Sequence, residues 1–278
     1  MNIMHFAGGG DIGGAKTHIL SLGKELSREN EFHLVSFRPG PFAEEARALG
    51  LDVTVVDSAW DLISGLRTAL KAVDAFKPDV IHCHGAKANM MGVLVKKLRR
   101  VPIVTTVHSD PARDYMGAPL KQWTFGNINF WALRRMDYYM AVAGRMEQTL
   151  IHRGIDPQKI FIIHNGLDFS SASDQPRPLR QEGDIVVGIA ARLTPIKNIP
   201  SLLRAFAQAY SRNPRLRLKI AGSGEDEASL KALAHKLNIS SRVDFVGWVT
   251  DMREFFAGVD INVLSSFSET FPYSLLEG

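Results

Sequence analysis

The sequence predicts an α/β protein made of two Rossmann-like domains, each a doubly wound parallel sheet. Three observations predict this fold class. The 278 residues exceed the usual size of a single core, so two domains are expected. Short apolar runs alternate with longer stretches of helical period, as in βα units around a parallel sheet. One polar, proline-bearing stretch interrupts this series, which then starts again.

The first series of elements occupies residues 1–168. Apolar runs predict strands at residues 2–7, 32–37, 53–57, 80–84, 103–108, 138–142 and 160–163. Helical periodicity predicts helices at residues 15–28, 62–76 and 86–98. From Asp168 onward serine, proline and charged residues replace the apolar pattern, and such a segment is not expected to pack into a core. Residues 169–183 are therefore predicted to be an interdomain linker.

The second series occupies residues 184–278 and has fewer strands. Strands are predicted at residues 185–190, 216–221, 243–246 and 261–264, with helices at 199–211, 226–237 and 252–257. Residues 272–278 are expected to begin a further helix, with Pro272 at its first position. Four strands followed by the start of a helix make an incomplete doubly wound domain. We therefore expect a C-terminally truncated form of a longer protein, and the prediction leaves open whether the shorter chain is active.

Composition and charge exclude several classes of protein, among them disulfide-bonded and membrane-spanning proteins. Cys83 is the only cysteine, which excludes an internal disulfide and indicates a cytoplasmic, reducing compartment. The sequence shows no signal-peptide pattern and no apolar run long enough to span a bilayer. The net charge is +4. Basic residues at 96–100 are interpreted as a solvated helix face or, alternatively, as a surface for anionic nucleotides, lipid headgroups or glycans. Nucleic acid is not expected, because no aromatic residues interleave with these charges.

Residues 115–139 are rich in aromatic and basic side chains. The favoured interpretation is a core-facing helix with a polar rim. A peripheral membrane contact that would bring a lipid-linked acceptor within reach is the alternative.

A glycine-rich loop follows the first predicted strand. Gly8-x-Gly10-x-x-Gly13 matches the dinucleotide fingerprint, and N–H groups at the start of a helix can receive a phosphate. That fingerprint expects an acidic residue near the end of the second strand, where this sequence has Arg38. An NADP-dependent oxidoreductase therefore remains one alternative, and a turn that serves only packing is another.

Two cations lie where the first strand of the second domain meets its first helix. Arg192 and Lys197 can converge on a diphosphate at the carboxyl end of the sheet, where they would neutralise charge on a departing diphosphate. Solvated charges on an exposed turn are the alternative. Gly222-x-Gly224 follows the next strand and permits a close backbone approach to a nucleotide.

His82 and His84 are predicted to share one face of a strand, with Cys83 on the other face. The pair of histidines is chemically suited to a metal. Histidines in the core or at a strand end are the favoured interpretation.

The segment from residue 265 to 278 carries the most specific signal. Glu269 is expected in the loop after the last strand, and Glu277 about one turn into the following helix. Carboxylates placed there can accept hydrogen bonds from sugar and ribose hydroxyls while the helix N-terminus faces a diphosphate.

Together these residues resemble family 4 of the retaining glycosyltransferases, which have the GT-B fold of two Rossmann-like domains facing a cleft. The resemblance covers nearly the whole chain. In chain order it consists of Gly13-Gly14, His108, Asn165-Gly166-Leu167-Asp168, Arg192 with Lys197, Gly222-x-Gly224, Val243-x-Phe245-x-Gly247 and Glu269-x7-Glu277. His164 departs from the family pattern, in which many members have a proline at this position.

The resemblance implies a role for several of these residues and for two neighbours. Arg192 and Lys197 would bind the donor diphosphate, Glu277 the ribose and Glu269 the transferred sugar. His108 would help to position the reacting sugar. The backbone near Gly13 and Gly14 would approach a phosphate or the acceptor, Gly222 and Gly224 would approach the nucleotide, and Val249 and Thr250 would contact the base.

The leading hypothesis is therefore transfer of a hexosyl unit from a nucleotide-diphosphate sugar to a glycan or lipid-linked acceptor, with retention of configuration. Cell-envelope polysaccharide or glycolipid synthesis is the expected setting, in the cytoplasm or at the inner face of the membrane. No cofactor and no metal are expected. Besides the NADP-dependent oxidoreductase, a non-catalytic two-lobed protein that binds a sugar or nucleotide remains an alternative.

Overall fold

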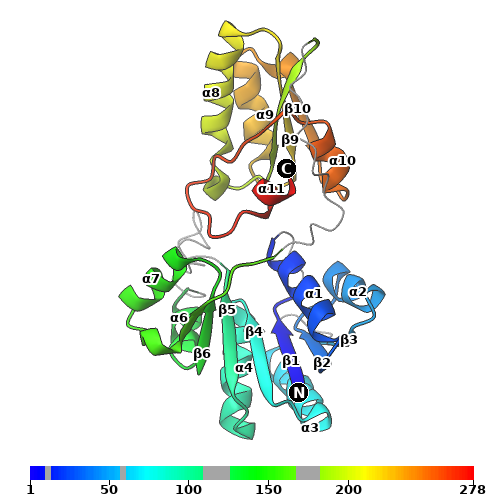
Figure 1. Ribbon diagram of the computed structural model, residues 1–278, viewed down its shortest axis with the longest axis vertical. Helices are drawn as coiled ribbons and strands as arrows, with labels where there is room; N and C mark the ends of the chain where they lie inside the picture. The colour runs from blue at the N-terminus through cyan, green and yellow to red at the C-terminus, as the bar shows by residue number, and fades with distance from the viewer. Residues whose placement is uncertain (10–13, 57–60, 109–125, 167–181) are drawn as a thin grey trace. The chain divides into compact units, whose positions relative to one another are not determined.

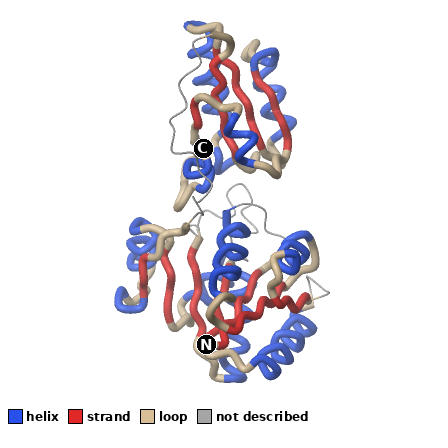
Figure 2. Tube along the Cα trace, turned by 45° about the vertical axis from the view of Figure 1, so that its right-hand side comes forward, coloured by secondary structure: helices blue, strands red, loops and turns tan. Residues whose placement is uncertain are grey.

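A computed structural model describes residues 1–9, 14–56, 61–108, 126–166 and 182–278. The chain divides into two compact units, Met1–Gly166 and Leu167–Gly278. Each unit contains one sheet with only parallel strand pairs in the described residues, and helices flank the strands (Figures 1 and 2). The predicted α/β class with parallel sheets is confirmed.

The first unit has a seven-stranded sheet in the order β3-β2-β1-β4-β5-β6-β7. Its strands are β1 (Asn2–Ala7), β2 (Glu31–Ser36), β3 (Asp52–Val55), β4 (Val80–His84), β5 (Ile103–Val107), β6 (Tyr138–Ala141) and β7 (Ile160–Ile162). The chain adds β2 and β3 on one side of β1 and then crosses over to place β4 on the other side. The carboxyl ends of β1 and β4 therefore flank the point at which the strand order reverses, which is where ligands bind in open α/β sheets.

Helices cover both faces of this sheet. They are α1 (Gly14–Leu26), α2 (Pro41–Ala48), α3 (Leu62–Phe76), α4 (Ala86–Arg99), α6 (Asn127–Leu133) and α7 (Gly144–His152), with a 3₁₀ turn η2 (Pro157–Lys159) before β7. The side chains of α3 and α4 share a core with Met4, Phe6 and Ile81, whereas α1 and α2 pack on Phe32 and Leu34. Successive residues of a strand thus face different helix layers.

The second unit has a four-stranded sheet in the order β10-β9-β8-β11. Its strands are β8 (Ile185–Ala190), β9 (Leu216–Ala221), β10 (Val243–Gly247) and β11 (Ile261–Asn262). The helices are α8 (Ile199–Arg212), α9 (Glu227–Lys236), α10 (Met252–Ala257) and α11 (Tyr273–Glu277), with 3₁₀ turns η3 (Pro195–Lys197) and η4 (Ser240–Arg242). Here the strand order reverses between β8 and β11.

Three aspartates form the same clamp at the amino ends of neighbouring strands. Asp79, Asp137 and Asp260 each lie one residue before a strand, namely β4, β6 and β11. Each carboxylate accepts a hydrogen bond from a backbone N–H of the adjacent strand, over 2.8–2.9 Å. Each aspartate N–H donates back to the carbonyl of that same residue, over 2.8–3.0 Å. The clamps join β1 to β4, β5 to β6 and β8 to β11.

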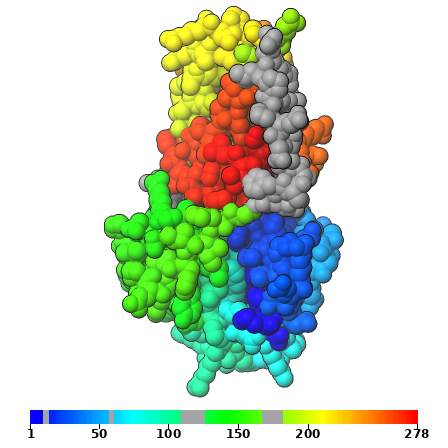
Figure 3. Space-filling view, in the orientation of Figure 1, coloured from blue at the N-terminus to red at the C-terminus, as the bar shows by residue number. Residues whose placement is uncertain are grey.

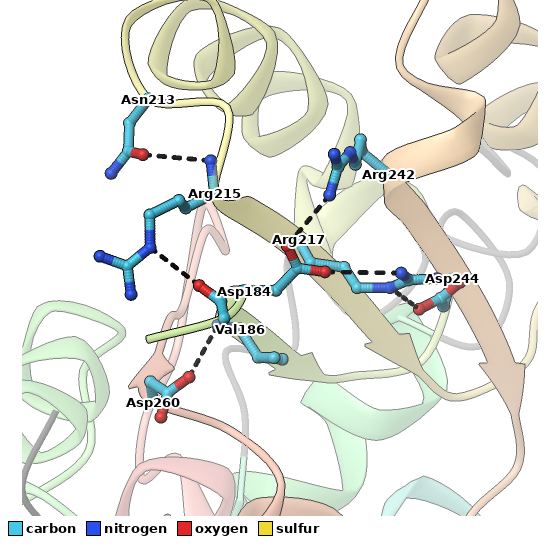
Figure 4. A network of polar contacts seen from close by, with 9 residues as sticks. Asp184, Val186, Asn213, Arg215, Arg217, Arg242, Asp244 and Asp260 are labelled. Atoms are coloured by element: carbon cyan, nitrogen blue, oxygen red, sulfur yellow. Dashed lines mark hydrogen bonds and ion pairs between the residues drawn. The ribbon is translucent and has the colours of Figure 1, made fainter. Parts of the chain in front are cut away.

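An ion-pair network reinforces the amino ends of the second sheet (Figure 4). Arg217 on β9 binds Asp244 on β10 through two hydrogen bonds of 2.7 and 3.1 Å. Asp184, just before β8, accepts a hydrogen bond of 3.1 Å from Arg242 and lies 3.7 Å from Arg217. The network therefore spans three adjacent strands.

The structure corrects several predicted boundaries. The helix predicted at 15–28 is Gly14–Leu26, the strand predicted at 53–57 is Asp52–Val55, and the strand predicted at 261–264 is Ile261–Asn262. Helices α2 and α7 were not predicted, and α6 lies within residues 115–139, where a core-facing helix was expected. Pro272 is not the first helical residue, because its backbone is extended and the helix begins at Tyr273. Almost all of the predicted linker, 169–183, lies outside the described residues.

Candidate functional site

Residues of the candidate donor site gather at the carboxyl ends of β8 and β11. Arg192 and Lys197 follow β8, and Glu269 follows β11. These two strands flank the reversal of strand order in the second sheet. Because both strands are parallel, their following loops lie at the same edge of the sheet, the expected ligand site of such a fold. The segment after β11 is red in Figure 3 and lies at the molecular surface.

Lys197 and Glu269 form a direct ion pair between these two loops. Their side chains are only 18% and 21% exposed. Ser266 also donates a hydrogen bond to Oε1 of Glu269, over 2.8 Å. The loops are further joined by the Ser265 hydroxyl, which donates to the Lys197 carbonyl over 2.8 Å. A lysine and a carboxylate, separated by 72 positions in the sequence, are thus held together.

Gly222 and Gly224 allow the loop after β9 to lie directly on the loop after β8. A Cβ atom at Gly222 would lie 2.0 Å from the carbonyl oxygen of Ala191, and one at Gly224 would lie 2.2 Å from that of Leu193. The backbone N–H of Leu193 donates to the carbonyl of Ser223 over 3.0 Å. These glycines therefore have a packing role that the sequence interpretation, based on approach to a nucleotide, had not included.

Glu277 lies on the short helix α11, which Asn262 holds through a 2.6 Å hydrogen bond from Nδ2 to the carbonyl of Ser274. Burial raises the pKa of the Glu277 carboxyl above its ordinary value. Burial, with a smaller effect of the Glu277 charge, raises the pKa of Tyr273 to about 12. Within the described part of the chain, the buried Tyr273 hydroxyl and Asn262 Oδ1 have no hydrogen-bond partner. Unsatisfied buried polar atoms next to a carboxylate are a feature of binding sites as well as of strained cores.

The remaining predicted donor residues differ in exposure. Arg192 and Thr250 are exposed. Val249 is half-buried and packs against the small core that contains Phe255 and Phe256. Its side chain therefore supports the loop after β10.

Five histidines cluster at the corresponding strand reversal in the first unit. His5 lies on β1, and in the sheet register it is paired with His82 on β4. His84 lies two residues further along β4, His18 is on α1 and His108 directly follows β5. His84 Nδ1 lies 3.3 Å from His108 Nε2, and His84 Nε2 lies 3.3 Å from His5 Nδ1. His82 Nε2 lies 2.7 Å from the hydroxyl of Thr106.

These histidines are neutral at neutral pH. Burial, with a smaller contribution from the nearby His18, lowers the pKa of His5 to about 3 and that of His108 to about 3. Burial lowers the pKa of His18 to about 4. Burial also lowers the pKa of His82 and that of His84. A neutral imidazole with so low a pKa can donate or accept a hydrogen bond, but it is a weak proton acceptor near pH 7.

Two groups within the cluster have the composition of a metal site. The ring nitrogens of His5, His82 and His84 come within 4.8 Å of one another, and so do those of His18, His84 and His108. Sequence reasoning noted that His82 and His84 share a face, but it missed His5 and His18. The available signal was that a histidine also lies on the first strand, although only the strand order places it beside His82. Cys83 is buried in the core on the other face of β4.

The glycine loop is only partly described. Gly10 and Gly13 lie outside the described residues, whereas Gly14 is the first, exposed residue of α1. Gly9 has a φ of +77°, and a Cβ atom there would lie 2.8 Å from Cβ of Arg38. The close approach to the end of β2 thus explains Gly9 through packing.

Side chains of the basic cluster at 96–100 and of the aromatic segment 115–139 make contacts within the first unit. Lys96 pairs with Asp137, and Arg99 pairs with Asp74. Arg135 stacks on the Trp131 ring, with its guanidinium 4.5 Å from the ring centroid. Residues 115–125 of the aromatic segment lie outside the described part. No helix among the described residues has the length and apolar character needed to cross a membrane.

Comparison with known families gives two adjacent matches. Residues 12–171, more than half of the chain, match the family described as Glycosyltransferase Family 4. Residues 171–278 match Glycosyl transferases group 1.

Individual proteins similar in sequence to this chain are also named as glycosyltransferases. A putative glycosyltransferase EpsD from Bacillus subtilis is 27% identical over 232 residues, covering 76% of this chain. A UDP-Gal:alpha-D-GlcNAc-diphosphoundecaprenol alpha-1,3-galactosyltransferase from Escherichia coli is 25% identical over 235 residues, covering 77% of this chain. The chain spans 59% of the length of each of these two relatives.

A solved structure of a similar protein has the same fold. The structure of Anabaena Alr3699/HepE in complex with UDP-glucose matches with a TM-score of 0.83 at 21% identity, over 99% of this chain and 77% of that one. The predicted GT-B fold is thereby confirmed, and the sheet of the second unit has four strands in the described residues. On these family matches, the chain belongs to the group 1 glycosyltransferases of family 4.

Proposed function

We propose that the complete protein transfers a hexosyl unit from a nucleotide-diphosphate sugar to a hydroxyl of a glycan or lipid-linked acceptor, with retention of configuration. The observation that carries this proposal is the Lys197–Glu269 pair at the carboxyl ends of β8 and β11. It places a cation for phosphate and an acceptor for sugar hydroxyls at the expected ligand edge of the second sheet.

The chemistry of these side chains suits a nucleotide-sugar donor. An ammonium group has three N–H donors, so Lys197 can keep its bond to Glu269 and still donate to a diphosphate oxygen. Arg192, which is exposed in the same loop, supplies the second positive charge. Both charges would stabilise the diphosphate as it departs. Glu277 would accept hydrogen bonds from the ribose, and the backbone at Val249 and Thr250 would contact the base.

His108 has a positioning role in this proposal and does not act as the general base. Its pKa of about 3, lowered mainly by burial, leaves it neutral and weakly basic. If the acceptor attacks from the face that the diphosphate leaves, a diphosphate oxygen can take the proton of the acceptor hydroxyl.

The relatives suggest which donor and acceptor to examine first. One solved relative binds UDP-glucose, and one curated relative is named for UDP-Gal and a diphosphoundecaprenol-linked acceptor. We therefore propose a UDP-hexose donor and a lipid-linked or polysaccharide acceptor, in cell-envelope polysaccharide or glycolipid synthesis. The protein would act in the cytoplasm, with peripheral contact at the inner face of the membrane.

The decisive experiment is a thermal-shift panel on the complete protein with UDP-glucose, UDP-galactose, GDP-mannose and ADP-glucose, followed by turnover assays with the donor that binds. Each donor is measured with added Mg²⁺ and with EDTA. Donor binding raises the free energy of unfolding by RT ln(1 + [L]/Kd) and thereby raises the unfolding temperature. Equal shifts with Mg²⁺ and EDTA would support metal independence. NMR of the product would report an unchanged anomeric configuration.

Several outcomes would refute parts of this proposal. Neither hydrolysis nor transfer with any of these donors would refute the enzyme assignment, and binding without turnover would favour the two-lobed binding protein. An inverted anomeric configuration would refute retention. Unchanged recovery of the protein in liposome co-sedimentation would refute membrane contact. The family matches leave the NADP-dependent oxidoreductase without support.

A further inference from the structure

Three imidazoles form a continuous hydrogen-bonded chain that ends at His108. His5 Nδ1 lies 3.3 Å from His84 Nε2, and His84 Nδ1 lies 3.3 Å from His108 Nε2. The first two rings are 0% and 2% exposed. The chain thus runs from the buried middle of β1, through β4, to the residue that follows β5.

Buried strands of a parallel sheet usually carry Val, Ile and Leu, and packing alone gives no reason for three adjacent histidines. Ring contacts hold the imidazoles in place. The His82 ring lies 4.2 Å from that of His84, and the His18 ring lies edge-on to that of His108 at 4.9 Å. These contacts limit ring rotation, so each nitrogen keeps the same partner.

The chain couples the tautomers of its three members. Burial keeps all three rings neutral by lowering their pKa values, so each ring has one N–H and one bare nitrogen. If His84 carries its proton on Nδ1, it donates to His108 and must accept from His5. All three rings are then protonated on Nδ1. If His84 carries its proton on Nε2, both links reverse and all three rings are protonated on Nε2.

The inner end of the chain distinguishes these two states. His5 Nε2 is buried and has no hydrogen-bond partner among the described residues. In the Nε2-protonated state this atom would be a buried N–H without an acceptor, and such orphaned N–H groups are rare in folded proteins. In the Nδ1-protonated state the same atom is only an unused acceptor.

We propose that His84 and His5 are positioning residues that hold His108 in the Nδ1–H tautomer, so that His108 presents a hydrogen-bond donor to the ligand. Nε2 of His108 is engaged by His84, which leaves Nδ1 as the nitrogen that the chain of imidazoles does not use. An N–H so fixed can donate to a hydroxyl oxygen of the transferred sugar without reorganisation. This inference rests on the proposed sugar-positioning role of His108.

The tautomers can be measured directly in the 278-residue chain, without substrate. Long-range ¹H–¹⁵N correlation NMR on protein labelled with ¹⁵N-histidine distinguishes a protonated from a bare ring nitrogen. EDTA is present to exclude metal binding, and resonances are assigned by single substitutions. We expect His5, His84 and His108 all to be protonated on Nδ1. Protonation of His108 on Nε2 would overturn the proposal.

Substitutions at His84 test whether the chain sets the tautomer. His84→Leu removes both links, and we expect His108 to become a mixture or to shift to Nε2–H. His84→Asn places an amide near the former Nδ1, which can still donate to His108, so the Nδ1–H tautomer should persist. His82→Gln tests the ring contact separately, because it removes the packing of His82 on His84, leaves both links of the chain and can keep the bond to Thr106. The Nδ1–H tautomer of His108 should persist in this variant. If His84→Leu leaves the tautomer of His108 unchanged, the coupling is refuted.

Kinetics of the complete protein then test the function of the coupling. Loss of one aligned hydrogen bond of about 1 kcal/mol corresponds to a roughly fivefold to tenfold lower kcat. We expect this loss in His84→Leu, with recovery in His84→Asn and with a smaller change in KM. An unchanged kcat in a folded His84→Leu variant would overturn the positioning role. If the wild-type protein transfers no sugar, the proposed function fails, while the tautomer measurement still decides whether the chain exists.

Discussion

Breaking the Lys197–Glu269 pair should destabilise the second unit more than removing both of its charges. Isolated loss of one partner from a buried pair costs about 3–5 kcal/mol, whereas exposed pairs contribute about 0–1 kcal/mol. The two side chains are 18% and 21% exposed, which places this pair between those limits. We therefore expect Lys197→Met to cost about 2–3 kcal/mol. Lys197→Met combined with Glu269→Gln should return to within about 1 kcal/mol of the wild type.

The effect is measurable by thermal unfolding followed through Trp248, which is the only tryptophan in residues 167–278. About 2 kcal/mol corresponds to a lower Tm by roughly 10 °C for a unit of this size. The matched control is the exposed pair Lys231–Glu227 on α9, whose side chains are 53% and 36% exposed. Its Lys231→Met variant should change stability by no more than about 0.5 kcal/mol. The reasoning would be refuted if the Lys197→Met and Glu269→Gln single variants each lost no more stability than the control and if their losses added in the double variant.

Three further predictions concern pH and backbone packing. Burial raises the pKa of Glu277 in the folded state, so its protonated form is favoured there. Stability from this group is present below its ordinary pKa of 4.5 and is lost as pH rises through the folded value. Glu277→Gln should therefore raise the Tm of the second unit at pH 7 while weakening donor binding, and a lower Tm would contradict this. The buried histidines have the opposite dependence, because their folded pKa values of about 3 to 4 lie below the ordinary 6.5. The first unit should lose stability as pH falls from 6.5 toward 4, and a flat Tm over that range would exclude neutral burial. Finally, Gly222→Ala forces a Cβ atom to within 2.0 Å of the Ala191 carbonyl oxygen and should cost about 2–3 kcal/mol in thermal unfolding. Gly247→Ala, which also has positive φ but meets open space, is the control and should cost less.

The sequence was sufficient to predict the order and type of most elements. Strands 2–7, 80–84, 185–190 and 216–221 and helices 62–76 and 252–257 agree with the structure at both ends. Most of these segments have a clear apolar pattern, so that intrinsic propensity and burial favour the same type of element. Helix α2 was missed with eight residues although the six-residue α10 was predicted, so length alone does not explain the difference. α2 begins with Pro41 directly after Gly40, a pair that predicts a turn from sequence alone.

The candidate site was predictable in its residue types and not in its pairings. Glu269 and Lys197 were expected to bind different parts of one ligand, but their direct ion pair depends on β8 and β11 being neighbours. His5 could not be placed beside His84, 79 positions away, without the strand order. Gly222 and Gly224 were interpreted through a ligand, because sequence does not reveal that a carbonyl oxygen of the preceding loop occupies the space beside each. The sequence pattern does not show which distant segments are in contact, because that depends on the strand order.

The aspartate clamps have a consequence for how this scaffold can change. Asp79 and Asp260 join neighbouring strands at their amino ends, whereas the candidate donor residues follow the carboxyl ends of β8 and β11. These clamps therefore do not involve the loops at the carboxyl ends. Loops of other sequence grafted there would meet strands that are already joined at their opposite ends. New specificities could thus arise through loop exchange while the sheets remain unaltered.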